Sequence, residues 1–194
     1  MSNYVSPIQL RINSELFSSK QRELNELVGN LSLNDVKEDT QFARTTHRIK
    51  NAILLKPVTF QEPKITGNYQ TEKTVPPNYQ DMWGGKRQIN IITVEFRFDG
   101  SPELFSYYPN NLSFGSSSNM RVYQPSGGNV ISVEVELPDL DKNKAINAAK
   151  AQMEMTFGLI NGNNSQAEQW SKTIELTIDS MLAAKRKEII DLYS

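Results

Sequence analysis

The chain lacks cysteine and contains one histidine, His47, among its 194 residues. Without cysteine it cannot form disulfides, thiolate nucleophiles or the cysteine ligands of structural zinc and iron–sulfur sites. A single imidazole cannot act both as a base and as a member of a metal-ligand cluster, and we interpret His47 as a structural residue. The composition therefore predicts no metal site and no cofactor. It leaves carboxylates, amines, hydroxyls and aromatic rings as the available chemistry.

An excess of charge of either sign is also missing. The chain has 21 lysine and arginine residues against 22 aspartate and glutamate residues, a formal net charge of −1. Proteins that bind duplex nucleic acid usually carry a clear excess of basic residues, which neutralise phosphates. The balance therefore argues against duplex nucleic acid as a partner.

Long apolar runs are absent as well. The longest mainly apolar segments, such as 52–55 and 89–94, are much shorter than the ~20 residues of a membrane-spanning helix. The first residues show no basic segment followed by an apolar one, so no signal peptide is predicted. We therefore expect a cytoplasmic protein with no membrane association.

Hydrophobic periodicity predicts helices towards both ends of the chain. Apolar residues at near-helical spacing predict a mainly helical segment over 7–28, whereas 44–48 fits either a strand or a helix. In the C-terminal third, the run of asparagine and glycine at 161–164 predicts a break between two helices. Ser165 and Glu168 then match a capping box, the expected start of a long final helix.

The middle of the chain contains the predicted strands. Segments 89–98 and 131–137 alternate apolar and polar residues, as half-buried strands do. Segment 61–88 is rich in proline and glycine, which predicts a long functional loop. We therefore predict an α+β fold, with a mostly antiparallel sheet flanked by an N-terminal helix and two C-terminal helices. The expected domains are an α+β core over 1–160 and a long C-terminal helix over 161–194, an assembly element.

Two loop segments carry candidate binding residues. Trp83 lies close to Lys86 and Arg87, and aromatic rings beside cations can stack on a ligand ring and contact a phosphate. Tyr107 and Tyr108 supply the aromatic area that recognition surfaces use. We predict contact with a protein partner or a small ligand at these residues. Packing within the loops is the alternative in both cases.

The end of the chain carries candidate assembly residues. The apolar stripe of the last helix continues to Ile189, Ile190 and Leu192, farther than a small domain is expected to cover. Each large apolar side chain left uncovered forgoes about 1.5–3 kcal/mol. We predict that these three residues mediate formation of a homo-oligomer or docking to another chain. Earlier in the stripe, Trp170, Ile174 and Ile178 are expected to pack on the sheet.

Carboxylates offer the alternative of an enzyme. Glu95, Glu134 and Glu136 are expected on the polar face of two strands, and Asp139 follows the second strand. Paired carboxylates in a cleft can catalyse hydrolysis, and they can also hold a metal ion. The same residues are equally expected on the wet face of a structural strand and at the start of a helix. No catalytic residue is therefore assigned, and a non-enzymatic protein is favoured.

The order of motifs also carries a resemblance. A strand is followed by Phe98-Asp99-Gly100-Ser101-Pro102-Glu103-Leu104-Phe105, a second strand and helices that end in Lys185-Arg186-Lys187. Over residues 89–190, this order resembles poorly characterised bacterial domains that sit upstream of effector domains in anti-phage defence proteins. The resemblance implies a sensing or assembly module and brings no catalytic residues with it.

The leading hypothesis is a non-enzymatic binding or assembly domain, a bacterial sensor or accessory module. One alternative is a carboxylate- or metal-dependent hydrolase. Another is a structural subunit of a larger particle, because long loops and a projecting helix also suit lattice contacts.

Overall fold

The computed structural model describes residues 4–5, 12–75, 85–109, 122–125 and 127–193. It confirms an α+β fold with an antiparallel sheet, an N-terminal helix and a long C-terminal helix. The chain divides into two compact units. The described residues of unit 1 come from Met1–Pro7, Val58–Phe105 and Ser116–Leu159, and those of unit 2 from Ile8–Pro57, Ser106–Gly115 and Ile160–Ser194. This division differs from the one expected from the sequence, because the N-terminal helices share a core with the C-terminal end of the chain.

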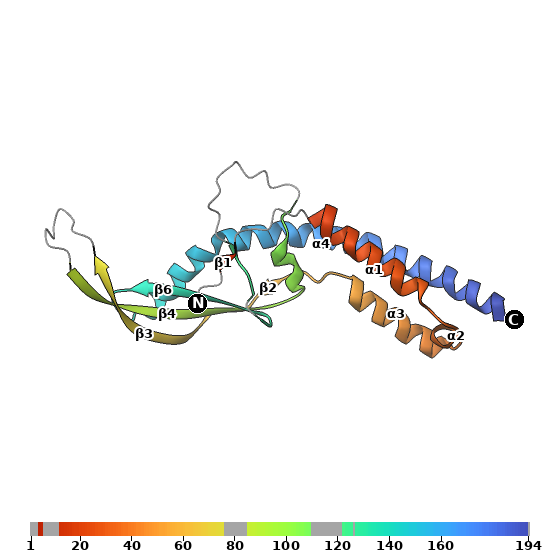
Figure 1. Ribbon diagram of the computed structural model, residues 1–194, viewed down its shortest axis with the longest axis horizontal. Coiled ribbons are helices and arrows are strands. Elements are labelled where there is room, and N and C mark those ends of the chain that lie inside the picture. Colours follow the sequence, from red (N-terminus) through yellow and green to blue (C-terminus); the bar gives the residue numbers. More distant parts are fainter. Residues whose placement is uncertain (1–3, 6–11, 76–84, 110–121, 126, 194) are drawn as a thin grey trace. The chain divides into compact units, whose positions relative to one another are not determined.

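The sheet of unit 1 is organised around one strand, β4 (Gly85–Asp99). β3 (Lys64–Val75) and β6 (Val130–Leu137) pair antiparallel with its two edges, and the short β2 (Thr59–Phe60) pairs with its end (Figure 1). Every second side chain of β4 from residue 92 to residue 98 is apolar and buried. A slip of one residue would turn this apolar set to the other face of the sheet, so the pattern fixes the strand register.

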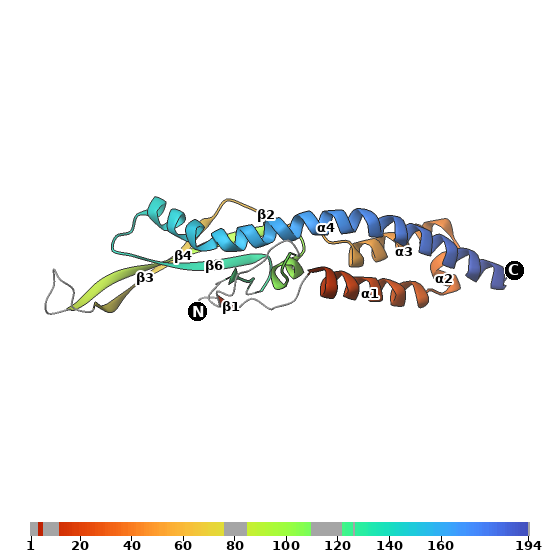
Figure 2. The ribbon, with the colours of Figure 1, turned by 90° about the horizontal axis from the view of Figure 1, so that it is seen from above.

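The first part of α4 (Lys142–Tyr193) covers the apolar face of this sheet (Figure 1, Figure 2). Its Phe157 ring packs edge-on against Phe96 of β4 and Phe60 of β2, with ring centroids 5.9 and 5.0 Å apart respectively. Edge-on aromatic pairs contribute about 0.5–1.5 kcal/mol beyond the area that they bury. This aromatic cluster therefore joins three elements of unit 1.

Three short elements complete unit 1. η2 (Pro102–Ser106) is a 3₁₀ turn. β5 (Val122–Tyr123) pairs with β1 (Tyr4–Val5). The backbone N–H of Tyr123 donates to the Thr156 hydroxyl of α4 at 3.0 Å, which attaches this small sheet to the helix.

Unit 2 is helical. A π-helical segment, η1 (Ile12–Phe17), leads into α1 (Ser18–Gly29), and α2 (Leu33–Val36) precedes α3 (Asp39–Ile53). α1 and α3 lie beside the later part of α4 (Figure 1, Figure 2). Their apolar faces share one core, which consists of Leu24, Val28, Leu31, Val36, Ile49, Ile53, Ile174, Ile178, Leu182 and Ile189.

The expected packing of Trp170, Ile174 and Ile178 on the sheet is wrong. Ile174 and Ile178 lie in the helical core of unit 2, and Trp170 packs against that core. The Trp170 ring stacks on Phe17, with centroids 4.8 Å apart. A helical stripe indicates that a face is buried, but it does not indicate which element covers it.

The expected break at 161–164 is also wrong, since α4 runs without interruption for 52 residues. There is one C-terminal helix, where the sequence predicted two. Asn163 is fully buried, and its side-chain amide donates to the carbonyl of Tyr107 at 2.7 Å. The Ser165 hydroxyl donates to the carbonyl of Asn161 at 3.1 Å, a bond made inside a helix and not at its start. Tertiary contacts thus override the weak helix propensity of this segment.

The predicted loop over 61–88 is largely a hairpin. β3 occupies 64–75 and β4 begins at Gly85, while 76–84 lie outside the described residues. Most described side chains of the hairpin's far end are exposed, so the apolar alternation that marks a half-buried strand is missing. The register shifts between Ile65 and Gly67, which marks a β-bulge in β3.

An acidic side chain at α2 generates a pH-dependent prediction. The Asp35 carboxylate accepts hydrogen bonds from the hydroxyl and N–H of Ser32 at 2.6 and 2.9 Å. These bonds, the hydroxyl bond first, hold the pKa of Asp35 below its ordinary value. Such a carboxyl stabilises the fold above the pKa of its unfolded form, and this contribution disappears as the pH falls through the folded pKa.

We therefore expect Asp35→Asn to lower the free energy of unfolding at pH 7 by less than about 1 kcal/mol, because the group is largely exposed. The difference from the parent should shrink as the pH falls from 5 to 2. Urea unfolding at several pH values measures it, with Asp191→Asn, at an exposed position near the end of α4, as the control. A difference that stays constant with pH would contradict the assignment.

Candidate functional site

Helix α3 has two chemically different faces. Thr45, Ile49 and Ile53 recur every four residues and are buried. Positions three and four residues apart lie on the same side of a helix. Each of the two arginines Arg44 and Arg48 comes one residue before a buried position. They therefore lie on a different side of α3 from the buried residues, and both are exposed.

Ion pairs anchor α3 to α4 within unit 2. The Lys50 amine lies 3.1 Å from Glu175 and 2.8 Å from Asp179. These carboxylates, Asp179 first, raise the pKa of Lys50. At the other end of α3, the Arg186 guanidinium contacts Asp39 at 2.6 Å. The helix thus has fixed contacts to α4 at both of its ends.

A shallow hollow lies on the exposed side of α3. It is lined by Ala43, Arg44, His47, Arg48 and Asn51, which we call the basic face of α3. The side-chain amide nitrogen of Asn51 lies 2.8 Å from Nε2 of His47. An amide nitrogen can only donate, so this contact is a hydrogen bond in the tautomer whose Nε2 is unprotonated. The small side chain of Ala43 leaves room between the longer ones.

The basic face of α3 is free of acidic residues from its own segment. No aspartate or glutamate occurs from residue 40 to residue 61. Arg48 does contribute to the lowered pKa of Asp35, but Ser32 makes the larger contributions through its two hydrogen bonds to that carboxylate. Arginine, histidine and asparagine side chains all present N–H donors, and arginine adds permanent charge. This arrangement can bind an anion.

Sequence reasoning missed this face. His47 was interpreted as a structural residue, but its side chain is exposed beside two arginines. Two signals in the sequence could have identified the face: the spacing of Arg44 and Arg48 by four residues, and the absence of carboxylates from 40–61. Both signals require that this segment be recognised as a helix.

The predicted loop site is only partly described. Trp83 lies outside the described residues. Lys86 is exposed on β4, and its amine lies 3.1 Å from the Glu72 carboxylate across the hairpin. Arg87 is exposed on the same strand. Ligand contact at these residues stays a prediction.

Tyr107 and Tyr108 belong to unit 2 and are half-buried. Their backbone carbonyls accept hydrogen bonds, from Asn163 at 2.7 Å and from the N–H of Ile12 at 2.9 Å. Burial raises the pKa of the Tyr108 hydroxyl. Both backbone groups therefore have a packing role, while ligand contact by the rings remains a prediction.

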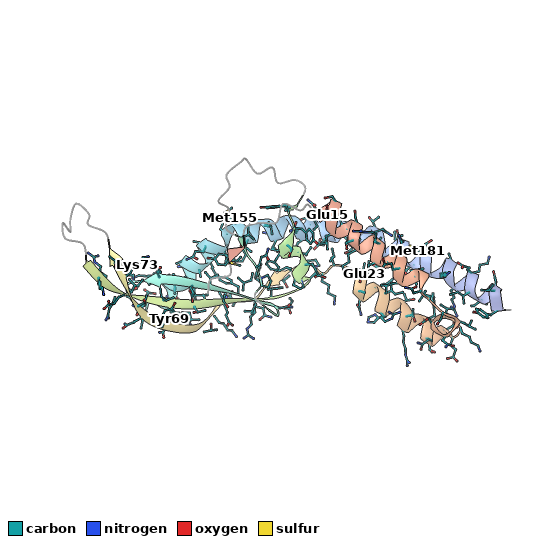
Figure 3. The ribbon with its side chains drawn as sticks, in the orientation of Figure 1. Glu15, Glu23, Tyr69, Lys73, Met155 and Met181 are labelled. Atoms are coloured by element: carbon teal, nitrogen blue, oxygen red, sulfur yellow. The ribbon has the colours of Figure 1, made fainter. Side chains whose placement is uncertain are left out.

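The carboxylates considered for catalysis have basic neighbours in most cases. Glu136 forms an ion pair with Lys73 of β3. The lysine is labelled in Figure 3. The Glu95 carboxylate lies 3.6 Å from Arg97, and that of Asp139 lies 2.8 Å from Lys144. These three carboxylates are therefore engaged in ion pairs with neighbouring side chains.

The three predicted assembly residues have different surroundings. Ile189 is 6% exposed and belongs to the core of unit 2, so it is not available as a surface contact. Ile190 is half-buried. Leu192 is 76% exposed and is followed by the exposed Tyr193. Of the three, Leu192 alone is fully accessible to another chain.

Comparisons with protein-family models, with curated proteins and with solved structures found no match to this chain. Within the described residues, no helix combines the length and the apolar character needed to cross a membrane. The same residues contain no group of three or more histidine, aspartate or glutamate side chains arranged to hold a metal ion. The surface chemistry of the chain is therefore the available indication of its function.

The different burial of Ile189 and Leu192 predicts different effects of one substitution. Ile189→Asp should lower the free energy of unfolding by about 3 kcal/mol, because it places a charge in an apolar core. Leu192→Asp should change it by less than about 0.5 kcal/mol, because the side chain is exposed. Chemical denaturation measures both effects, and native mass measurement of Leu192→Asp tests self-association. Equal destabilisation by the two substitutions would contradict the placement of Ile189.

Proposed function

We propose that this chain is a non-enzymatic binding domain, a sensor or accessory module of the bacterial cytoplasm. It recognises an anionic segment of a partner protein through the basic face of α3. The observation that carries this proposal is a hollow lined by two arginines, a histidine, an asparagine and one small alanine. All four polar side chains can offer N–H donors to an anion.

The packing of α3 within unit 2 supports a binding role for the hollow. All five lining residues belong to a single helix, and the opposite side of that helix is buried in the core of unit 2. Lys50 and Arg186 add ion pairs between α3 and α4. A preformed backbone loses little conformational freedom on binding, so more of the interaction energy contributes to affinity.

The chemistry of the face favours binding over catalysis. Its side chains include no hydroxyl, thiol or carboxylate, so they provide no protein nucleophile other than the imidazole. His47 is held by Asn51, whereas a general base of the triad type is oriented by a carboxylate or carbonyl acceptor. The resemblance of residues 89–190 to domains upstream of defence effectors supports the same role, because it implies sensing or assembly in anti-phage defence.

The proposal predicts selective, salt-sensitive binding of acidic peptides. A fluorescent peptide of ten glutamates should bind the full chain at low salt, while a peptide of ten lysines should not. The double variant Arg44→Ala/Arg48→Ala should bind the glutamate peptide about tenfold more weakly, a loss of about 1.4 kcal/mol. Fluorescence anisotropy at two salt concentrations measures this, because exposed charges are screened by salt.

A matched control removes the same charge elsewhere. Lys172→Ala/Lys187→Ala takes two exposed cations from α4 and should leave binding nearly unchanged. Equal weakening in both double variants would show that net charge alone attracts the peptide. That result, or no binding by the parent, would refute the proposed function.

A further inference from the structure

Resting on the proposed function, we infer that the anion bound by the basic face of α3 is a phosphate monoester. It is carried by a phosphorylated side chain in an extended segment of the partner protein. The site consists of Arg44, His47, Arg48 and Asn51, and Ala43 also lines the hollow.

The charge of the site matches a dianion. Arg44 and Arg48 are one helical turn apart, and Cβ atoms at this spacing lie about 5–6 Å from each other. Among the described residues, neither guanidinium forms an ion pair with a carboxylate, whereas Lys50 on the same helix contacts two. Like charges at this spacing repel each other. A phosphate monoester carries about −1.5 to −2 charges at pH 7, and a carboxylate carries one.

The donor groups also match a phosphate. Each guanidinium presents a planar fork of N–H groups that pairs with two oxygens of an oxyanion. In the tautomer that accepts the bond from Asn51 at Nε2, the imidazole of His47 presents its Nδ1–H as a donor. Three donor groups on one helical face can serve the three terminal oxygens of a phosphate monoester. A carboxylate offers two oxygens, so it would leave one of the three donor groups without an oxygen to itself.

The surroundings of the hollow favour a phosphate carried by a peptide. No phenylalanine, tyrosine or tryptophan lines it, so the large rings on which nucleotide bases commonly stack are missing from its lining. Single-stranded nucleic acids are bound along a row of cations with stacked bases. Here two arginines stand together on an open surface, where a short phosphorylated side chain can reach them.

The single histidine provides a probe for the test. Because His47 is the only imidazole of the chain, its ring-proton NMR signals can be followed without assignment of the others. The full chain is titrated with the peptide Gly-Gly-Ser-Gly-Gly in three forms: phosphorylated on serine, unmodified, and with glutamate in place of serine. Inorganic phosphate and adenosine monophosphate form two further arms.

The phosphorylated peptide should shift the His47 signals saturably, with an affinity about tenfold higher than that of the glutamate form. The unmodified peptide should cause no saturable shift, and inorganic phosphate should shift the signals in the same direction. Arg44→Ala/Arg48→Ala should weaken phosphopeptide binding about tenfold or more, while Lys172→Ala/Lys187→Ala should retain it. Far-UV circular dichroism should show the same helix content in both double variants, because the four substituted side chains are all exposed.

Several results would overturn the inference. Unmoved His47 signals, or equal binding by parent and arginine variant, would exclude the site. Tighter binding of adenosine monophosphate than of the phosphopeptide would assign the site to nucleotides. Equal affinity for the phosphorylated and glutamate peptides would refute the phosphate specificity and leave the proposed function standing. Failure of the ten-glutamate peptide to bind would refute both.

Discussion

Burial of the apolar side of α4 is the interaction on which both units depend. In unit 1 the helix contributes Phe157 and the fully buried Met153, which pack with elements of the sheet unit. In unit 2 it contributes Ile178 and Leu182, whose exposed fractions are 0% and 1%. At roughly 25 cal/mol per Å², such side chains supply the main free energy that opposes chain entropy. The fold of both units therefore depends on the apolar side of this helix and much less on the identity of the exposed polar residues.

Much of the fold could be predicted from local patterns, because those patterns have direct physical causes. The alternation along 89–98 and 131–137 predicted β4 and β6, since half-buried strands repeat every two residues. The continuity of α4 could not be predicted in this way. Asn163, in the middle of the expected break, donates a hydrogen bond to Tyr107, 56 positions away in the sequence, and local patterns do not reveal such a contact.

Polar elements were the hardest to predict. The hairpin of β3 and β4 has wet side chains on both faces at its far end, so neither strand shows an apolar period there. Its order comes from backbone pairing, which is independent of side-chain polarity. The same difficulty hid the basic face of α3. Its members are ordinary surface residues in the sequence, and only the helix brings Arg44, His47 and Arg48 to one side.

The irregular outer strand β3 has a consequence for the behaviour of the chain at high concentration. Regular exposed strand edges act as templates for further strands, which leads to aggregation between molecules. β3 departs from regularity at the bulge between Ile65 and Gly67, and it carries exposed lysines at Lys64 and Lys73. A bulge bends the edge, and a lysine that enters a foreign sheet loses hydration. The sequence of β3 thus discourages the addition of a strand from another molecule without any loss of pairing to β4.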